Sequence, residues 1–118
     1  MHPFQRTELL VGTAGWARLQ AARVMVVGVG GGGSYAAEAI VRAGVGHLTL
    51  VDFDRVCLTN LNRQLHATRR TIGASKVGLM AERCRSINPK VDVRVEQRFF
   101  EADNAEELLA PGFDCVID

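Results

Sequence analysis

Cysteine pairs and long apolar runs are both missing from this chain of 118 residues. Its three cysteines, Cys57, Cys84 and Cys115, are odd in number and form no C-x-x-C pair, which excludes a disulfide framework and a zinc ribbon. The longest strongly apolar run, residues 24–29, is far shorter than the ~20 residues that cross a bilayer. The first residues lack the basic start and apolar middle of a secretory signal. We therefore expect a cytoplasmic protein.

Net charge is also nearly absent, at +1, with 47% hydrophobic and 23% charged residues. This composition is typical of one compact globular domain. The charges are nevertheless segregated, because residues 55–81 carry bases and no acid, whereas residues 99–118 carry acids and no base. The basic segment has two interpretations, a solvated face or a region that binds anions.

The order of the predicted elements indicates the α/β class. The β-branched run at 24–29 is typical of a strand covered on both faces, and the apolar spacing over 34–43 is typical of a helix. Strands and helices alternate from there on, which predicts a Rossmann-like, doubly wound and mainly parallel sheet. The expected elements are a helical lead-in at 4–22, strands at 24–29, 47–51, 91–96 and 113–117, helices at 34–43, 75–87 and 103–110, and a loop with short helical turns at 55–70.

Two finer expectations concern the ends of the chain. In the helical lead-in, Leu9, Leu10, Trp16 and Leu19 are expected to make the apolar contacts. In the last helix, Asp103 is expected to be the N-terminal cap, because a short acidic side chain can accept a hydrogen bond from the first turn.

A glycine-rich segment lies between the first strand and the first helix, where residues 28–34 read Gly-Val-Gly-Gly-Gly-Gly-Ser. Glycines let backbone N–H groups approach a phosphate, and the helix N-terminus adds a partial positive charge. An acid at the end of the second strand, Asp52, stands where it can accept hydrogen bonds from a ribose. The pattern predicts a nucleotide site, which a dinucleotide oxidoreductase would build in the same way. Its residues are Gly28, Gly30, Gly31, Gly33 and Asp52.

Three nitrogen-bearing side chains follow Asp52 and favour phosphoryl chemistry. Arg63 can donate two hydrogen bonds to phosphate oxygens, and Asn60 can donate its amide without adding charge. Lys76 lies in the first turn of a predicted helix, at the unfavourable end of the helix dipole. It is either a solvated lysine or a phosphate ligand, and the nearby arginine favours the second interpretation.

Other reactive side chains are weaker candidates. His66 is more often a packing or capping residue than a base in such a loop. Cys57, Cys84 and Cys115 are interpreted as small core residues rather than nucleophiles. The histidines show no metal-ligand spacing.

Several separated motifs occur in one order along the chain, at residues 28–34, 42–46, 52–54, 59–64, 72–76 and 87–89. Together they resemble the ThiF/MoeB/HesA superfamily of adenylating enzymes, which are related to ubiquitin activators. The resemblance runs from about Phe4 to the end of the chain. Within the superfamily, residues 57–60 and 62–67 look most like the tRNA threonylcarbamoyladenosine dehydratases. One departure is Gly32, where the family usually has a branched aliphatic residue.

The resemblance implies that a substrate carboxylate attacks the α-phosphorus of ATP, giving an acyl adenylate and pyrophosphate. In the tRNA-modifying subgroup this carboxylate belongs to a threonylcarbamoyl group on a tRNA adenosine, and its activation leads to cyclisation. By motif position, Gly31 lies against the nucleotide and Asp52 holds the ribose. Asn60, Arg63 and Lys76 contact the phosphates, with Arg63 as the principal stabiliser of the transition state.

The resemblance also bears on partners and on the extent of the chain. Arg6 falls where many relatives place an arginine that reaches into the partner's site in a homodimer, although a surface arginine near a frayed terminus is the other interpretation. The family's Mg²⁺-binding aspartate lies beyond Asp118, so residues 1–118 are expected to be the N-terminal, nucleotide-binding part of a longer enzyme and inactive alone. Two other functions stay open, adenylation of a ubiquitin-like sulfur carrier and an NAD- or FAD-binding Rossmann module.

Overall fold

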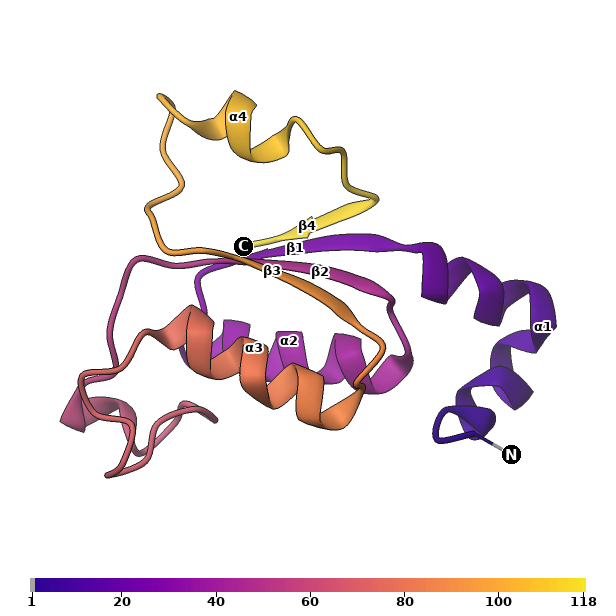
Figure 1. Ribbon diagram of the computed structural model, residues 1–118, viewed down its shortest axis with the longest axis horizontal. Coiled ribbons are helices and arrows are strands. Elements are labelled where there is room, and N and C mark those ends of the chain that lie inside the picture. The colour runs from indigo at the N-terminus through magenta and orange to yellow at the C-terminus, as the bar shows by residue number, and fades with distance from the viewer. Residues whose placement is uncertain (1) are drawn as a thin grey trace.

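A four-stranded parallel sheet forms the centre of the protein (Figure 1). The computed structural model describes residues 2–118. The strands stand in the order β3-β2-β1-β4, which confirms the expected Rossmann-like α/β architecture. Their bounds are β1 Arg23–Val27, β2 His47–Val51, β3 Asp92–Glu96 and β4 Cys115–Ile117.

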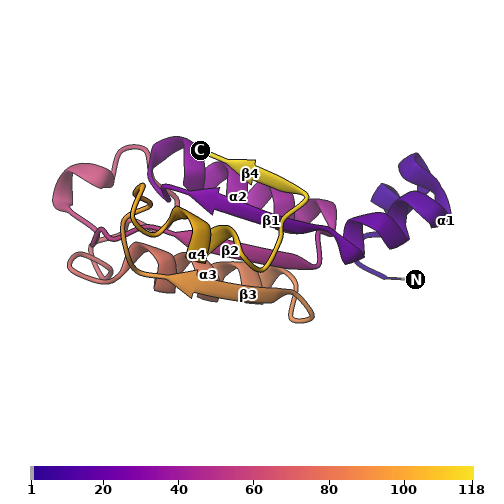
Figure 2. The ribbon, with the colours of Figure 1, turned by 90° about the horizontal axis from the view of Figure 1, so that it is seen from above.

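Helices cover both faces of the sheet. Helices α2 (Gly31–Ala43) and α3 (Lys76–Ile87) lie on one face, and the short α4 (Ala105–Leu109) lies on the other (Figures 1 and 2). A single 3₁₀ turn, η1 (Leu58–Asn60), lies in the expected loop, and α1 (Gln5–Ala21) precedes the first strand. In the described part of the chain, no helix combines the length and hydropathy needed to span a bilayer.

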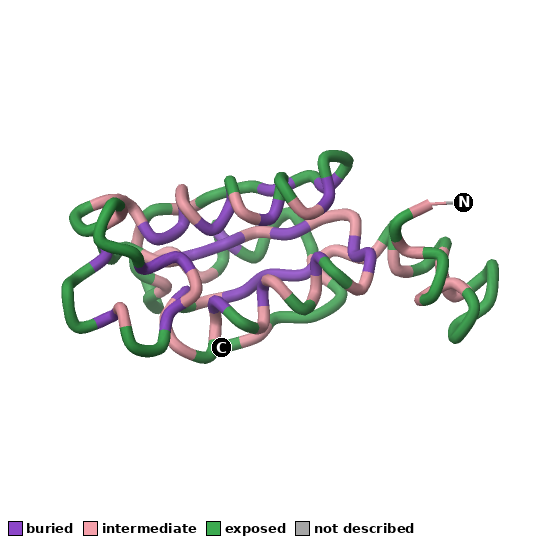
Figure 3. Tube along the Cα trace, turned by 90° about the horizontal axis from the view of Figure 1, so that it is seen from below, coloured by how far each residue is buried: buried purple, intermediate pink, exposed green. Residues whose placement is uncertain are grey.

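The main core lies between the sheet and the α2/α3 layer. Alternate side chains of β1 and β2, Val24, Val26, Leu48 and Leu50, point into it and are buried. A smaller cluster of Met25, Val51 and Leu108 lies under α4 on the other face. Figure 3 shows the buried segments concentrated in the strands and in the inner sides of α2 and α3. Burial on both faces explains why the β-branched first strand reads as one continuous apolar run.

The strand order also fixes where a ligand crevice opens. The first two crossovers run from β1 to β2 and from β2 to β3, whereas the last one returns to the opposite side of β1. In such sheets the crevice lies at the carboxyl ends of the strands, at the point where the order reverses. That point is the carboxyl end of β1, where the glycine-rich segment begins.

Helix α1 differs from its expectation in the first half. Gly12 adopts a non-helical conformation with φ of 78° and kinks the helix. The residues before the kink therefore turn away from the sheet, and Leu9 and Leu10 are 77% and 88% exposed, so their expected apolar contacts are wrong. After the kink the expectation holds, because Leu19 packs against the core and the Trp16 ring lies over Gly44.

Two helix boundaries also differ from expectation. Helix α2 begins at Gly31 rather than at Ser34, so most of the glycine run forms the first helical turn. The N-cap of α4 is Asn104 and not Asp103. The Asn104 side chain bonds the preceding turn, accepting from Glu101 N–H and donating to Phe99 O, and this local bonding displaces the start of the helix.

The cysteines differ in accessibility. Cys84 is buried as expected, and burial, assisted by the charge of Glu38, raises the pKa of its thiol to about 11. Cys57 and Cys115 are exposed, so their assignment to the core is wrong.

At pH 8 only about one Cys84 thiol in a thousand is ionised. We expect iodoacetamide to label Cys57 and leave Cys84 unmodified until denaturant is added, as measured by peptide mass spectrometry. Labelling of native Cys84 at the rate of Cys57 would contradict this burial.

Candidate functional site

The glycine-rich turn after β1 brings backbone very close to backbone. Gly28 has a φ of 85°, a conformation that favours glycine, and its N–H donates to Val51 O at 2.8 Å. Gly30 is the N-cap of α2. A Cβ atom at Gly33 would lie 1.7 Å from Gly28 O, so only glycine fits this crossing of turn and helix. The first N–H groups of α2 have no partner within the helix, and the glycines there carry no side chains of their own that would keep a phosphate away.

Asp52 follows β2 and holds this turn in place. Its Oδ2 accepts a hydrogen bond from Val29 N–H at 2.6 Å, and its Oδ1 accepts one from Asp54 N–H at 2.8 Å. Each carboxylate oxygen can accept more than one hydrogen bond, so acceptor capacity remains for a ligand hydroxyl. Asp52 therefore fixes the glycine turn and stays half-buried beside it.

The three predicted phosphate ligands line one cavity. It has a volume of about 670 Å³ and lies among the segments that follow β2 and the start of α3. The structure thus brings Asn60, Arg63 and Lys76 together from η1, the loop after it and a helix. Of the basic segment's other arginines, Arg55 also lines this cavity, so three of the segment's five basic side chains are gathered there. The remaining lining residues are Phe53, Asp54, Cys57, Thr59, Gln64 and Gln97.

Two of the three predicted phosphate ligands, Asn60 and Lys76, are buried and held by the local fold. The Asn60 side chain accepts from Cys57 N–H at 2.8 Å, which closes the 3₁₀ turn η1 on itself. Lys76 is the first residue of α3 and only 6% exposed. Its ammonium lies 3.8 Å from the Asp54 carboxylate, at the cavity wall. A buried cation that faces a cavity with one partner contradicts the interpretation of Lys76 as a solvated lysine.

Arg63 connects the cavity to the glycine turn. Its guanidinium donates to Thr59 O and to the Asn62 side chain, both at 2.9 Å, and remains exposed. Its aliphatic stem lies along Gly31, where an added Cβ would be 3.6 Å from Arg63 Cδ. The two predicted halves of the site, glycines and nitrogen-bearing side chains, therefore adjoin.

Arg6 takes no part in this constellation. It lies exposed in the first turn of α1, at the opposite end of the sheet from the segments that follow β2 (Figure 1). Any contribution of Arg6 to such a site has to come from a second copy of the chain.

Sequence reasoning gave no role to several residues that line the cavity. Gln64 is 6% exposed, and its Oε1 has no hydrogen-bond partner within residues 2–118. The Phe53 ring stacks on Phe99 with 4.8 Å between centroids. Gln64 stands next to Arg63 in the motif and was open to assignment on that ground, whereas the Phe53–Phe99 pair joins segments far apart in the sequence.

Burial lowers the pKa of His66, and the charge of Lys76 adds to the effect, whereas the hydrogen bond to Val29 and the charge of Asp52 oppose it. Because the pKa of His66 is lower in the folded protein, the unfolded chain binds the proton first as the pH falls. The free energy of unfolding therefore decreases between the usual pKa of 6.5 and the lowered pKa of the folded state. We expect the thermal midpoint of the wild type to decrease as the pH is lowered below about 6.5. The decrease is expected to be smaller in His66→Gln, because glutamine does not titrate. Parallel midpoint curves for the two proteins would contradict this expectation.

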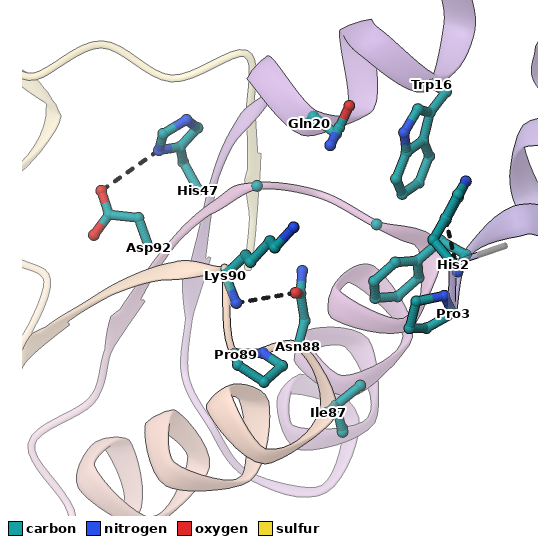
Figure 4. A pocket seen from close by; sticks show the side chains of 13 residues that line it. His2, Pro3, Trp16, Gln20, His47, Ile87, Asn88, Pro89, Lys90 and Asp92 are labelled. Atoms are coloured by element: carbon teal, nitrogen blue, oxygen red, sulfur yellow. Dashed lines mark hydrogen bonds and ion pairs between the residues drawn. The ribbon is translucent and has the colours of Figure 1, made fainter. Parts of the chain in front are cut away.

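A second cavity of about 520 Å³ lies near the amino ends of the strands (Figure 4). The Trp16 ring stacks on His2 with 5.1 Å between centroids, and Asn88 and Pro89 face them from the end of α3. None of the predicted site residues lines this cavity. Its place at the amino ends of the strands is the wrong end for the crevice of a parallel sheet.

Comparison with known proteins identifies relatives of this chain. The model of the ThiF family matches residues 4–118. A curated relative, the tRNA threonylcarbamoyladenosine dehydratase of Bacillus subtilis, is 47% identical over 118 residues, which are 100% of this chain and 46% of that protein. The sulfur carrier protein adenylyltransferase of Thermus thermophilus is 39% identical over 92% of this chain and 40% of its own length. The chain thus spans less than half the length of these relatives.

A solved structure agrees over the same range. The Escherichia coli tRNA N6-threonylcarbamoyladenosine dehydratase in complex with ATP superimposes with a TM-score of 0.96 and is 45% identical, covering 98% of this chain and 48% of that one. The two proteins therefore share the fold over almost all of this chain.

Proposed function

The chain belongs to the ThiF family, and on that premise we propose that it is the N-terminal, nucleotide-binding part of an enzyme that adenylates a carboxylate with ATP. The observation that carries the proposal is the convergence of Asn60, Arg63 and Lys76 on one cavity beside the glycine turn. A redox Rossmann module needs the turn and the acid but not these three nitrogen donors. The complexes of the E. coli relative with ATP and with AMP support the same nucleotide class.

The proposed substrate is the carboxylate of a threonylcarbamoyl group on a tRNA adenosine. Its oxygen attacks the α-phosphorus of ATP, the bond from that phosphorus to the bridging oxygen breaks, and pyrophosphate leaves with the electron pair. The acyl adenylate then cyclises with release of AMP. In this mechanism Arg63 and Lys76, which line the same cavity, stabilise the negative charge that develops on the phosphoryl oxygens. Asp52 accepts hydrogen bonds from the ribose, and a tRNA substrate fits the expected cytoplasmic location.

The proposed Mg²⁺ ligands lie outside this chain. Within residues 2–118 no three His, Cys, Asp or Glu side chains are grouped to hold a metal. Near the cavity the Asp54 carboxylate is paired with Lys76. These residues do not by themselves fit a divalent cation, which is held by several oxygen ligands.

We further propose a homodimer in which Arg6 enters the partner's site. Helix α1 exposes Leu9, Leu10 and Val11, an apolar surface next to Arg6 that a second copy would cover. If the site is shared, Arg6→Ala and Arg63→Ala chains, each inactive alone, are expected to regain about a quarter of wild-type activity when they are co-expressed in equal amounts. Half of the dimers then contain one chain of each kind, and each of these dimers has one intact site of two. No recovery after co-expression would contradict a shared site.

The function is tested by ATP–pyrophosphate exchange in the full-length protein. We expect labelled pyrophosphate to enter ATP when tRNA bearing threonylcarbamoyladenosine is present. Exchange only with a ubiquitin-like sulfur carrier ending in Gly-Gly would support the alternative that the T. thermophilus relative suggests. Calorimetric binding of NAD without binding of ATP would overturn the adenylation proposal.

A further inference from the structure

A buried histidine joins the loop that carries Arg63 to the glycine turn. His66 is 5% exposed, and its Nε2 lies 2.7 Å from Val29 O. A carbonyl oxygen only accepts hydrogen bonds, so Nε2 carries the proton and donates. The other ring nitrogen, Nδ1, is buried and has no hydrogen-bond partner in the described chain. His66 is thus held as the neutral tautomer with its proton on Nε2.

Val29, the residue that His66 contacts, is held through both of its backbone polar groups. The Val29 N–H donates to Asp52 Oδ2 at 2.6 Å, and the Val29 carbonyl accepts from His66. The Val29 side chain is fully buried. Because C=O and N–H point in opposite directions in a trans peptide, the hydrogen bond from His66 also sets the direction of Gly30 N–H.

Gly30 N–H is one of the donors that the glycine turn can offer to a phosphate. Gly30 is the N-cap of α2, and its N–H is not taken up by a carbonyl or side chain of residues 2–118. The loop of His66 is also linked to α2 itself, because Leu65 N–H donates to the Ser34 hydroxyl at 3.4 Å. The turn and the loop that bears Arg63 are therefore linked through His66.

We propose that His66 is a positioning residue of the nucleotide site, which directs Gly30 N–H toward the phosphates and sets the spacing between the glycine turn and Arg63. The inference rests on the proposed function and adds a residue to it. His66 does not line the cavity. Its effect is expected on phosphate binding, through Gly30 N–H, and not on the nucleoside, because Asp52 is also fixed independently by Asp54 N–H.

The test compares variants of the full-length protein in calorimetric titrations with adenosine, AMP and ATP. In His66→Gln the side-chain amide reaches as far as Nε2 and still donates, whereas in His66→Asn it is too short. We expect the asparagine variant to bind ATP and AMP about tenfold more weakly, with adenosine unchanged, and the glutamine variant to stay within about twofold of wild type. His47→Asn, the same change at the other end of the sheet, serves as the matched control and is expected to leave all three affinities unchanged.

Three results would overturn the role of His66. One is unchanged ATP binding in His66→Asn, and another is an equal loss for adenosine, AMP and ATP that glutamine does not rescue. The third needs no variant, because ¹⁵N spectra of the wild-type ring are expected to show the proton on Nε2, and a proton on Nδ1 would exclude the hydrogen bond to Val29. A wild-type protein that binds no ATP would instead overturn the proposed function, and this role with it.

Discussion

Arg63→Ala in the full-length protein is expected to lower the rate of ATP–pyrophosphate exchange by at least about a hundredfold. In the proposed mechanism this arginine stabilises the charge that develops on phosphorus, and within residues 2–118 its guanidinium donates hydrogen bonds to Thr59 O and the Asn62 side chain. Its removal therefore deletes a transition-state contact while leaving the core untouched. The thermal midpoint should stay close to that of the wild type, because the side chain is exposed.

The matched control is Arg69→Ala, which removes the same charge from an exposed position nearby that does not line the cavity. Its exchange rate is expected to remain near wild type. Arg63→Lys keeps the charge but loses the planar fork, and should recover only part of the rate. Equal exchange rates in the Arg63→Ala and Arg69→Ala variants would contradict the proposed role of Arg63.

Gly33→Ala is expected to destabilise the protein by about 3 kcal/mol or more, a fall of roughly 10 °C in thermal midpoint. The added Cβ would lie 1.7 Å from Gly28 O and 2.8 Å from Gly28 C, so two backbone segments must separate. Neither segment is a flexible side chain that can rotate away. Separation also breaks the approach of the turn to the start of α2, so nucleotide binding should be lost together with stability.

The neighbouring glycine supplies the control for this prediction. A Cβ at Gly32 meets nothing within 4 Å, and Gly32 lies in the first turn of α2. Alanine is a better helix former than glycine by up to about 1 kcal/mol. Gly32→Ala is therefore expected to keep or raise the midpoint measured by differential scanning fluorimetry. A fall as large as that of Gly33→Ala would show that the steric reasoning is wrong.

The central sheet was predictable because its signals are local. The apolar run that forms β1 and the Asn88-Pro89 stop that ends α3 act through residues close in the chain. The kink at Gly12 was not predictable, because a glycine inside a helical pattern is compatible with a straight helix as well as a bent one. The start of α2 was missed for a related reason, since glycines carry no helical periodicity.

The grouping of three candidate side chains was predictable from the sequence, whereas their surroundings and contacts were not. Spacing and motif order indicated Asn60, Arg63 and Lys76, and the structure brings all three to one cavity. The position of Cys57 at that cavity, and the ring pair of Phe53 with Phe99, depend on how distant segments fold over one another. Such tertiary contacts leave no periodic signal in one sequence. The exposure of Cys57 shows that an apolar neighbourhood in the chain does not guarantee burial.

Asp52 gives the crevice a rigid acceptor. Two backbone N–H groups, those of Val29 and Asp54, already fix both of its oxygens. A side chain that is ordered only on binding loses about 0.5 to 1.5 kcal/mol of affinity to that ordering. The preorganised carboxylate of Asp52 is spared this entropic penalty, so in the proposed site a ribose hydroxyl pair would bind there without the cost of ordering its acceptor.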